Sequence, residues 1–153
     1  MDPRVSLRSP EGDDGKEGVL SEFTVDPQIV ADSMPVTELG LSHVRLMRDA
    51  NYPWLLLLPR RSAVEIVDLD PADRIVLMEE IATASAALRE SVPCDKLNVA
   101  SFGNAVRQMH VHVIARRFDD VGWPKPVWGT APKKEYEPGV AEALVDKLKA
   151  RLK

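Results

Sequence analysis

Cysteine and histidine are both scarce in this 153-residue sequence, and each scarcity limits what the protein can be. Cys94 is the single cysteine, so the chain forms no internal disulfide, which is typical of proteins kept in a reducing cytoplasm. The three histidines are His43, His110 and His112, and the last two lie only two residues apart. Two of the three histidines in one short stretch indicate that this stretch has a chemical role.

Long hydrophobic runs and an excess of positive charge are also missing. The longest apolar run, residues 54–58, is far too short to span a bilayer, and the first 18 residues lack the apolar core of a secretory signal. The net charge of -4 argues against a general binder of nucleic-acid polymers, which is usually basic. We therefore expect a cytoplasmic protein with no membrane or nucleic-acid partner, although a local anion site stays open.

The sequence divides into a polar front segment and a domain-sized remainder. Residues 1–18 are rich in Pro, Gly, Asp and Ser, which predicts a disordered tail, and residues 19–153 have the length of one ordinary domain. Predicted strands cover residues 42–48, 54–58, 96–102 and 108–116, and predicted helices begin at Asp26-Pro27, Asp70-Pro71 and Gly139. Short connectors favour antiparallel pairing. We expect an α+β fold, with a mostly antiparallel sheet of about five strands under one long helix and a C-terminal helix.

Apolar periodicity predicts which face each of the two larger helices buries. In the long helix, residues 71–91, the expected inward face includes Ile75, Met78, Ile81 and Leu88. In the last helix, residues 139–152, it consists of Val140, Leu144, Leu148 and Leu152.

The histidine pair lies in the stretch QMHVHVIAR, which alternates polar and apolar residues as a strand does. Residues two apart on a strand point the same way, about 6.6 Å apart, so Gln108, His110 and His112 should share one face. The alternating valines can then pack on the opposite face. A merely solvated histidine face is the less favoured interpretation, because two histidines in register with a glutamine are unusual in so histidine-poor a chain.

Two kinds of chemistry fit this strand. A His-x-His pair can bind one metal ion, but a metal site needs a third ligand, for which His43 or Asp119 are candidates. Alternatively, one imidazole is a nucleophile toward phosphorus and the other assists it. A nucleophilic histidine must be uncharged and held in one tautomer, usually by a hydrogen bond to its other ring nitrogen.

The stretch QMHVHVI resembles the signature of the histidine-triad (HIT) superfamily, with Gln108 in place of the first histidine. The segments LMRDANYPWLLLLPRR, KLNVASFGN and WPKPVWG extend the resemblance over residues 23–129. Together they look like the bacterial branch described as diadenosine-tetraphosphate-hydrolase-like. The resemblance implies a HIT-like fold and a homodimer.

The resemblance also implies a function: a nucleotide-binding hydrolase or nucleotidyl transferase that needs no cofactor or metal. It would act at the α-phosphate of nucleoside phosphates or dinucleoside polyphosphates through a nucleotidyl-histidine intermediate. His110 matches the nucleophile. His112 matches the histidine that contacts the phosphate and leaving-group oxygens, and its backbone carbonyl would orient His110. Gln108 would be an orienting residue, because an amide cannot carry a proton charge.

The resemblance suggests substrate contacts for three asparagines, Asn98, Asn104 and Asn51, although Asn104 and Asn51 are equally typical turn residues. It places the base and ribose pocket around residues 46–54, and Trp123 and Trp128 would either close the site, join a dimer interface or pack ordinarily. Two alternatives remain: a nucleotide-binding protein with little turnover, because the triad is incomplete, and a metalloenzyme built on His110 and His112.

Overall fold

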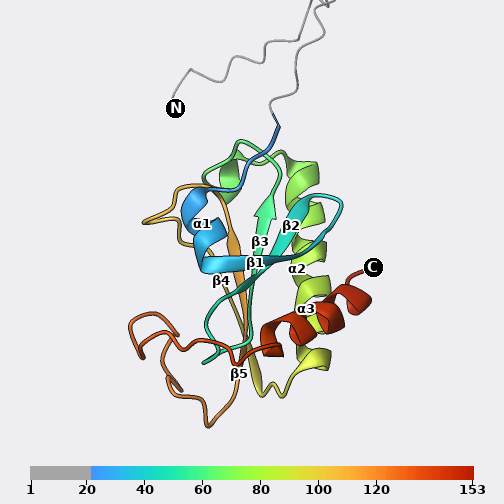
Figure 1. Cartoon of the computed structure of the whole chain (residues 1–153). Coiled ribbons are helices and arrows are strands. Elements are labelled where there is room, and N and C mark those ends of the chain that lie inside the picture. The colour runs from blue at the N-terminus through green and yellow to red at the C-terminus, as the bar shows by residue number, and fades with distance from the viewer. Residues whose placement is uncertain (1–21) are drawn as a thin grey trace, which may run out of the picture.

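The computed structural model describes residues 22–153, and a five-stranded antiparallel sheet lies at its centre (Figure 1). The strands follow the order β1-β2-β3-β5-β4, and each neighbouring pair is antiparallel. Their bounds are Ser33–Glu38 (β1), Ser42–Met47 (β2), Trp54–Pro59 (β3), Lys96–Ala100 (β4) and Val111–Arg116 (β5). The predicted tail, residues 1–18, lies outside the described residues.

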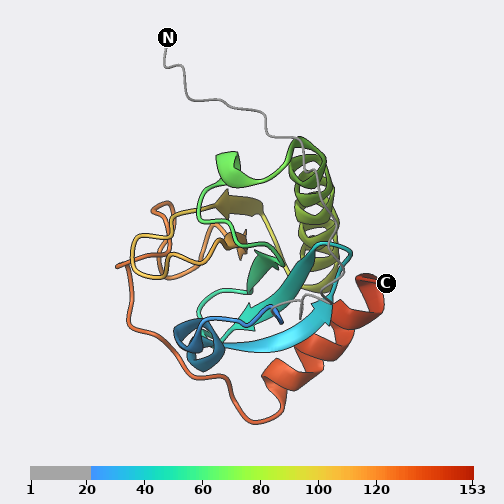
Figure 2. The ribbon, with the colours of Figure 1, turned by 90° about the horizontal axis from the view of Figure 1, so that it is seen from above.

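Helices cover the sheet unequally (Figures 1 and 2). They are α1 (Pro27–Asp32), the short 3-10 helix η1 (Ile66–Asp68), α2 (Pro71–Ser91) and α3 (Val140–Arg151). In the view from above, α2 and α3 lie on one side of the sheet, whereas α1 and the long loops lie on the other (Figure 2). This arrangement confirms the predicted α+β fold. Among residues 22–153, no helix is long and apolar enough to cross a membrane.

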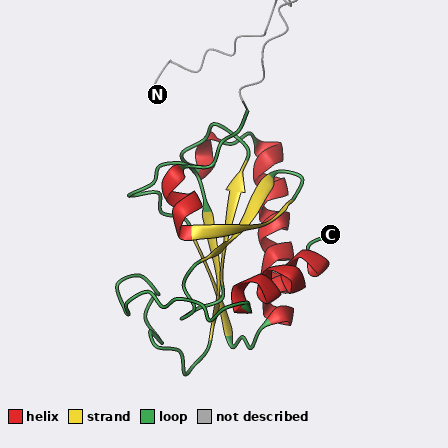
Figure 3. Cartoon of the chain, in the orientation of Figure 1, coloured by secondary structure: helices red, strands yellow, loops and turns green. Residues whose placement is uncertain are grey.

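Both faces of the sheet are packed, which explains why β3 and β5 are buried along their whole length. The larger core lies between the sheet and the pair α2 and α3, and the sheet contributes to it mainly Val44, Leu46, Leu55, Leu57, Val111 and Val113. A smaller apolar cluster on the opposite face contains Ile29, Tyr52, Trp54, Leu56, Leu58, Ile114 and Val127. Ile29 of α1 and Val127 of the loop after β5 belong to this second cluster, and Figure 3 shows α1 in red and the loops in green.

Strand β1 was not predicted from the sequence, because a proline lies inside it. Pro35 has no N–H to donate, so proline within a sheet is confined to edge strands and irregular positions. β1 satisfies both conditions, since it is an outermost strand and its register with β2 shifts between Pro35 and Thr37.

The long helix has the predicted bounds, but it buries a different face. Ile75 and Met78, both predicted to face inward, are 68% and 63% exposed. The buried positions are Leu77, Glu80, Ala84, Ala87, Leu88 and Ser91. Glu80 belongs inside because its carboxylate accepts a hydrogen bond of 2.6 Å from the Leu41 N–H. Apolar periodicity cannot recognise an inward face that contains a partnered carboxylate, so the prediction was wrong for Ile75 and Met78. Leu88 is buried as predicted, and Ile81 is half-buried against the same core.

For the C-terminal helix, the predicted inward face is wrong at one position, Val140. Leu148 and Leu152 are buried as predicted, but Val140 is exposed and Ala141 is buried instead. A strict four-residue spacing drifts around a helix of 3.6 residues per turn, so the buried stripe starts one residue later than predicted.

Candidate functional site

His110 and His112 lie on the sheet face opposite α2 and α3, where the smaller apolar cluster packs. His110 is the residue before β5 and His112 is inside it, and their side chains are only 9% and 6% exposed. Their ring centroids are 5.0 Å apart. β5 begins at Val111 rather than at Gln108, so the predicted strand is three residues too long at its start. The chain before Val111 is irregular, and Gln108 consequently leaves the face that the two histidines share.

A single hydrogen bond sets the tautomer of His110. Its ring Nδ1 lies 2.6 Å from the backbone carbonyl oxygen of Gln108. A carbonyl oxygen only accepts, so Nδ1 carries the proton and a neutral His110 keeps a free lone pair on Nε2. The orienting carbonyl therefore belongs to Gln108 and not to His112, because the irregular chain before β5 folds residue 108 back against the ring.

His112 is held in the opposite tautomer. The indole N–H of Trp54 donates to its Nδ1 at 3.0 Å, and an indole N–H cannot accept, so the proton of a neutral His112 lies on Nε2. Burial, and secondarily the neighbouring His110, lowers the pKa of His112 to about 4. The aromatic rings of Trp54, Phe102 and Trp128 surround it at centroid distances of 5.6, 6.0 and 4.9 Å. His112 is thus a neutral hydrogen-bond donor near pH 7.

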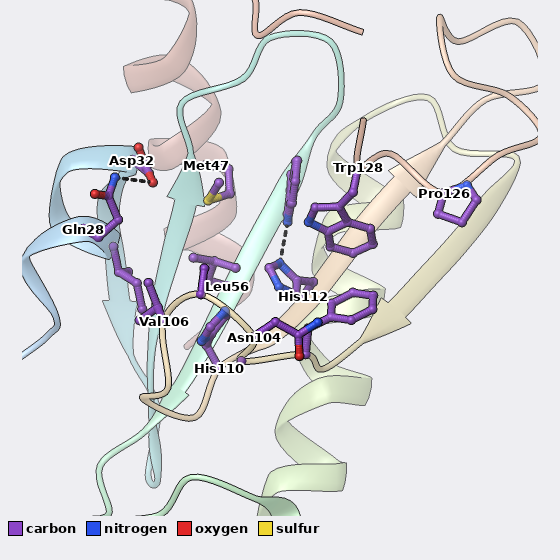
Figure 4. Close-up of a pocket in the computed structure, with 15 residues that line it drawn as sticks. Gln28, Asp32, Met47, Leu56, Asn104, Val106, His110, His112, Pro126 and Trp128 are labelled. Atoms are coloured by element: carbon purple, nitrogen blue, oxygen red, sulfur yellow. Dashed lines mark hydrogen bonds between the residues drawn. The ribbon is translucent and has the colours of Figure 1, made fainter. Parts of the chain in front are cut away.

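The two imidazoles form one wall of a cavity of about 660 Å³ (Figure 4). Most of the other lining side chains are apolar or aromatic: Ile29, Met47, Trp54, Leu56, Phe102, Val106, Pro126 and Trp128. Asn104, Gln28 and Asp32 are the polar side chains that line it besides the histidines. An apolar cavity of this size with a few polar groups is typical of a small-molecule site.

Residues 28–119 match the HIT domain family. The solved structure of a histidine triad protein from Bradyrhizobium japonicum is 43% identical to this chain, covers 86% of it and 98% of its own length, and superposes with a TM-score of 0.83. Similar proteins from Sinorhizobium meliloti (37% identity, 85% and 97% coverage, TM-score 0.82) and Marinobacter aquaeolei (36%, 85% and 96%, 0.81) agree. No curated protein sequence is significantly similar to this chain. The chain belongs to the HIT family.

Gln108, the departure from the HIT signature, does not line the cavity. Its side-chain Nε2 donates to the backbone carbonyl of Thr24 at 2.8 Å, and its Oε1 accepts from the backbone N–H of Asp26 at 2.9 Å. Asp26 in turn caps α1, since its carboxylate accepts from the Gln28 N–H at 2.8 Å. The Gln108 side chain therefore ties the histidine segment to the start of the helix that forms the opposite wall.

Of the three asparagines expected to contact substrate, only Asn104 lines the cavity. Asn98 accepts a hydrogen bond of 2.9 Å from Arg116, and Asn51 donates one of 2.8 Å to the Pro132 carbonyl. The expected base pocket around residues 46–54 contributes Met47 and Trp54 to the cavity.

Trp128 reaches the cavity because the loop after β5 is firmly anchored. Arg116 is only 1% exposed and binds Asp120 through two hydrogen bonds of 2.8 and 3.0 Å. The guanidinium carbon of Arg116 also lies 5.3 Å from the Tyr52 ring centroid and 5.5 Å from that of Trp123. Trp123 thus packs in this anchor, whereas Trp128 lines the cavity.

A metal site built on His110 and His112 would need a third ligand, and the described residues supply none. Across residues 22–153, no group of three His, Cys, Asp or Glu side chains lies close enough together to hold a metal ion. His43 stacks on Phe23 and its Nδ1 lies 3.1 Å from the Glu38 carboxylate, and Asp119 pairs with Arg117.

Two features of the site were not predicted from the sequence: α1 lines the cavity, and the Trp54 indole N–H donates to His112. The pair Asp26-Pro27 did predict the start of a helix. No local signal says that this helix lies beside the histidine segment some 80 residues later, because the contact that joins them, from the Asp26 N–H to Gln108, spans 82 residues.

We expect His112 to stay neutral, with its proton on Nε2, down to about pH 5, because its pKa is lowered to about 4. An unfolded chain takes up this proton below the ordinary histidine value of 6.5, and the folded protein does not. The free energy of unfolding should therefore fall as the pH drops from 6.5 toward 4. Ring-nitrogen NMR and urea unfolding at pH 7 and 5 measure both effects. The variant His112→Gln should lose part of this pH dependence, and titration of His112 near 6.5 would contradict the assignment.

Proposed function

We propose that this HIT protein is a nucleotide hydrolase or nucleotidyl transferase that acts at the α-phosphate through a nucleotidyl-histidine intermediate. One observation carries the proposal: two buried histidines in opposite tautomers face a nucleotide-sized cavity, one with a free lone pair and the other with an N–H to donate. Nucleoside phosphates and dinucleoside polyphosphates are the substrate classes. A cytoplasmic location stays a prediction from the sequence.

The first step joins the substrate to the enzyme. The Nε2 lone pair of His110 attacks the α-phosphorus, an N–P bond forms, and the bond from phosphorus to the leaving group breaks. The ring becomes positively charged, and its Nδ1–H stays bonded to the Gln108 carbonyl, which stabilises that charge. His112, with its lowered pKa, donates its Nε2–H to a phosphate or leaving-group oxygen without becoming a cation. Asn104 offers an amide to the same phosphate.

The second step releases the nucleotide. Water attacks the phosphorus from the side that the leaving group vacated, and the N–P bond breaks. The electron pair of that bond returns to Nε2, the water loses one proton to solvent, and a nucleoside monophosphate leaves. His110 keeps its Nδ1 proton throughout, so the enzyme returns to its starting tautomer. An alcohol or amine in place of water would make the same chemistry a transfer.

A nucleotide-binding protein with little turnover is the second candidate. The specific observation in its favour is that Gln108, at the first position of the triad, directs its side chain to Thr24 and Asp26 and away from the histidine pair. The two candidates differ in turnover and share the binding site.

We expect His110→Ala to abolish turnover of a fluorogenic nucleoside phosphoramidate while nucleotide binding persists, because the nucleophile is lost and the cavity remains. His112→Ala should leave a slow enzyme that accumulates the covalent adduct. Mass spectrometry of protein quenched at alkaline pH locates the adduct, with the exposed variant Arg107→Ala as control. An adduct on His112, or an active His110→Ala enzyme, would overturn the roles. Binding without any turnover would favour the second candidate.

We expect Gln108→Leu to raise KM more than it lowers kcat. Any residue at position 108 keeps the backbone carbonyl that orients His110, whereas leucine removes both side-chain bonds to the segment before α1. Steady-state kinetics give kcat and KM for Gln108→Leu, with Arg107→Ala as the control variant. A lower kcat with an unchanged KM would mean instead that the Gln108 side chain takes part in the chemical step.

We also propose a homodimer through the outer surface of α2 and β4. That surface exposes Ile75, Val76 and Met78 on α2 and Val99 on β4, which is an edge strand, and apolar exposure beside an open edge favours a twofold partner. Light scattering at micromolar concentration should give the mass of a dimer. The double variant Ile75→Glu/Val99→Glu should give a folded monomer, whereas Val67→Glu, on the equally exposed η1, should stay dimeric. A monomeric wild-type protein would refute the dimer.

A further inference from the structure

The cavity has a polar end that the proposed chemistry does not use. Gln28 and Asp32 of α1 line the side opposite His112 and Trp128, with the apolar side chains of Met47, Leu56 and Val106 between the two sides (Figure 4). These two are the polar side chains at that end, so they decide which polar groups a ligand can place there.

The two side chains form one hydrogen-bonded unit. The Gln28 amide Nε2 donates to one carboxylate oxygen of Asp32 at 2.9 Å. Within the described residues, the second carboxylate oxygen of Asp32 and the amide oxygen of Gln28 have no hydrogen-bond partner in the side-chain contacts around the cavity. Both free atoms are acceptors. The second N–H of the Gln28 amide stays free as a donor. The unit therefore offers a ligand two acceptors and one donor, and the charged carboxylate favours N–H or O–H donors on the ligand.

The short helix that carries this unit is held at both ends. At its start, Asp26 caps the helix and is itself bound by the side chain of Gln108. At its end, the buried Ser33 hydroxyl donates to the Ile29 carbonyl and accepts from Arg45 Nε at 2.7 Å. Acceptors on so fixed a support are preorganised for a ligand, which lowers the entropy lost on binding.

We propose that the α1 end of the cavity recognises the nucleobase and prefers guanine. This inference rests on the proposed function, which places the α-phosphate at His110. The ribose then follows the phosphate, and the base lies farthest from it, at α1. Guanine presents two neighbouring donors, N1–H and the exocyclic amine. The Asp32 carboxylate can accept from both, because the oxygen that accepts from Gln28 keeps a second lone pair.

Adenine fits the same end poorly. Its Watson–Crick edge offers an amine beside an unprotonated ring nitrogen, and the lone pair of that nitrogen would face the Asp32 carboxylate. Hypoxanthine keeps N1–H but lacks the exocyclic amine, so it should rank between the two. A hydrogen bond to a charged group is worth enough to separate guanine from adenine by roughly tenfold or more at a partly exposed site.

The test compares guanosine, inosine and adenosine 5′-phosphoramidates on the full-length protein by kcat/KM. Wild-type enzyme should prefer guanosine by about tenfold, with inosine in between. Asp32→Asn should remove most of that preference, because its amide presents an N–H donor to the donors of guanine. Asp146→Asn, an exposed aspartate of α3, is the matched control and should keep it. Thermal melting establishes that both variants are folded.

Three results would overturn the inference. The first is an equal or greater kcat/KM for adenosine in the wild-type enzyme. The second is a guanosine preference that Asp32→Asn leaves unchanged. The third is an Asp32→Asn effect that vanishes with the 2′-deoxyguanosine substrate, because the carboxylate would then bind the ribose hydroxyl. If no substrate turns over, the proposed hydrolysis fails, but calorimetric binding of GMP and AMP to wild type and Asp32→Asn tests the base preference by the same criteria.

Discussion

The antiparallel pairing of β3 with β5 is the constraint on which the rest of the structure depends. Its register sets Leu56 opposite His112 and Trp54 opposite Ile114, so the indole of Trp54 can reach the His112 ring. Both strands are buried on both faces, and a slip of one residue would exchange their faces. The histidine would then face the core beneath α2, and the valines would face the cavity. Packing on both faces therefore fixes the chemistry as well as the fold.

Within that register, two single hydrogen bonds make the two histidines different. They have the same side chain, lie two residues apart and are almost equally buried. The His110 Nδ1–H donates a hydrogen bond to a carbonyl oxygen, which can only accept, and His112 Nδ1 accepts one from an indole N–H, which can only donate. The site thus holds one ring nitrogen with a free lone pair and one N–H donor without needing a charge on either ring.

Gln108 departs from the family signature, and its side chain contacts the segment before α1 and not the histidine pair. The backbone of this residue acts on His110, while its side chain acts on the segment before α1. The histidine end and the α1 end of the cavity are therefore linked through one residue. A neutral histidine at this position would also offer one donor and one acceptor, but at ring positions that differ from those of the amide.

Local chemistry in the sequence determined much of this protein. Alternation in QMHVHVIAR, the two Asp-Pro helix starts and the apolar run at residues 54–58 were enough to predict the α+β fold, the histidine face and most element bounds. These signals succeed because each depends on neighbouring residues. Tertiary structure alone decided the inward face of α2, where Glu80 pairs with a backbone N–H across the core, and the edge strand that contains Pro35. It also decided the tautomers of the histidines and the placement of Gln28 and Asp32, because their partners lie far away in the sequence and only the packed sheet brings them together.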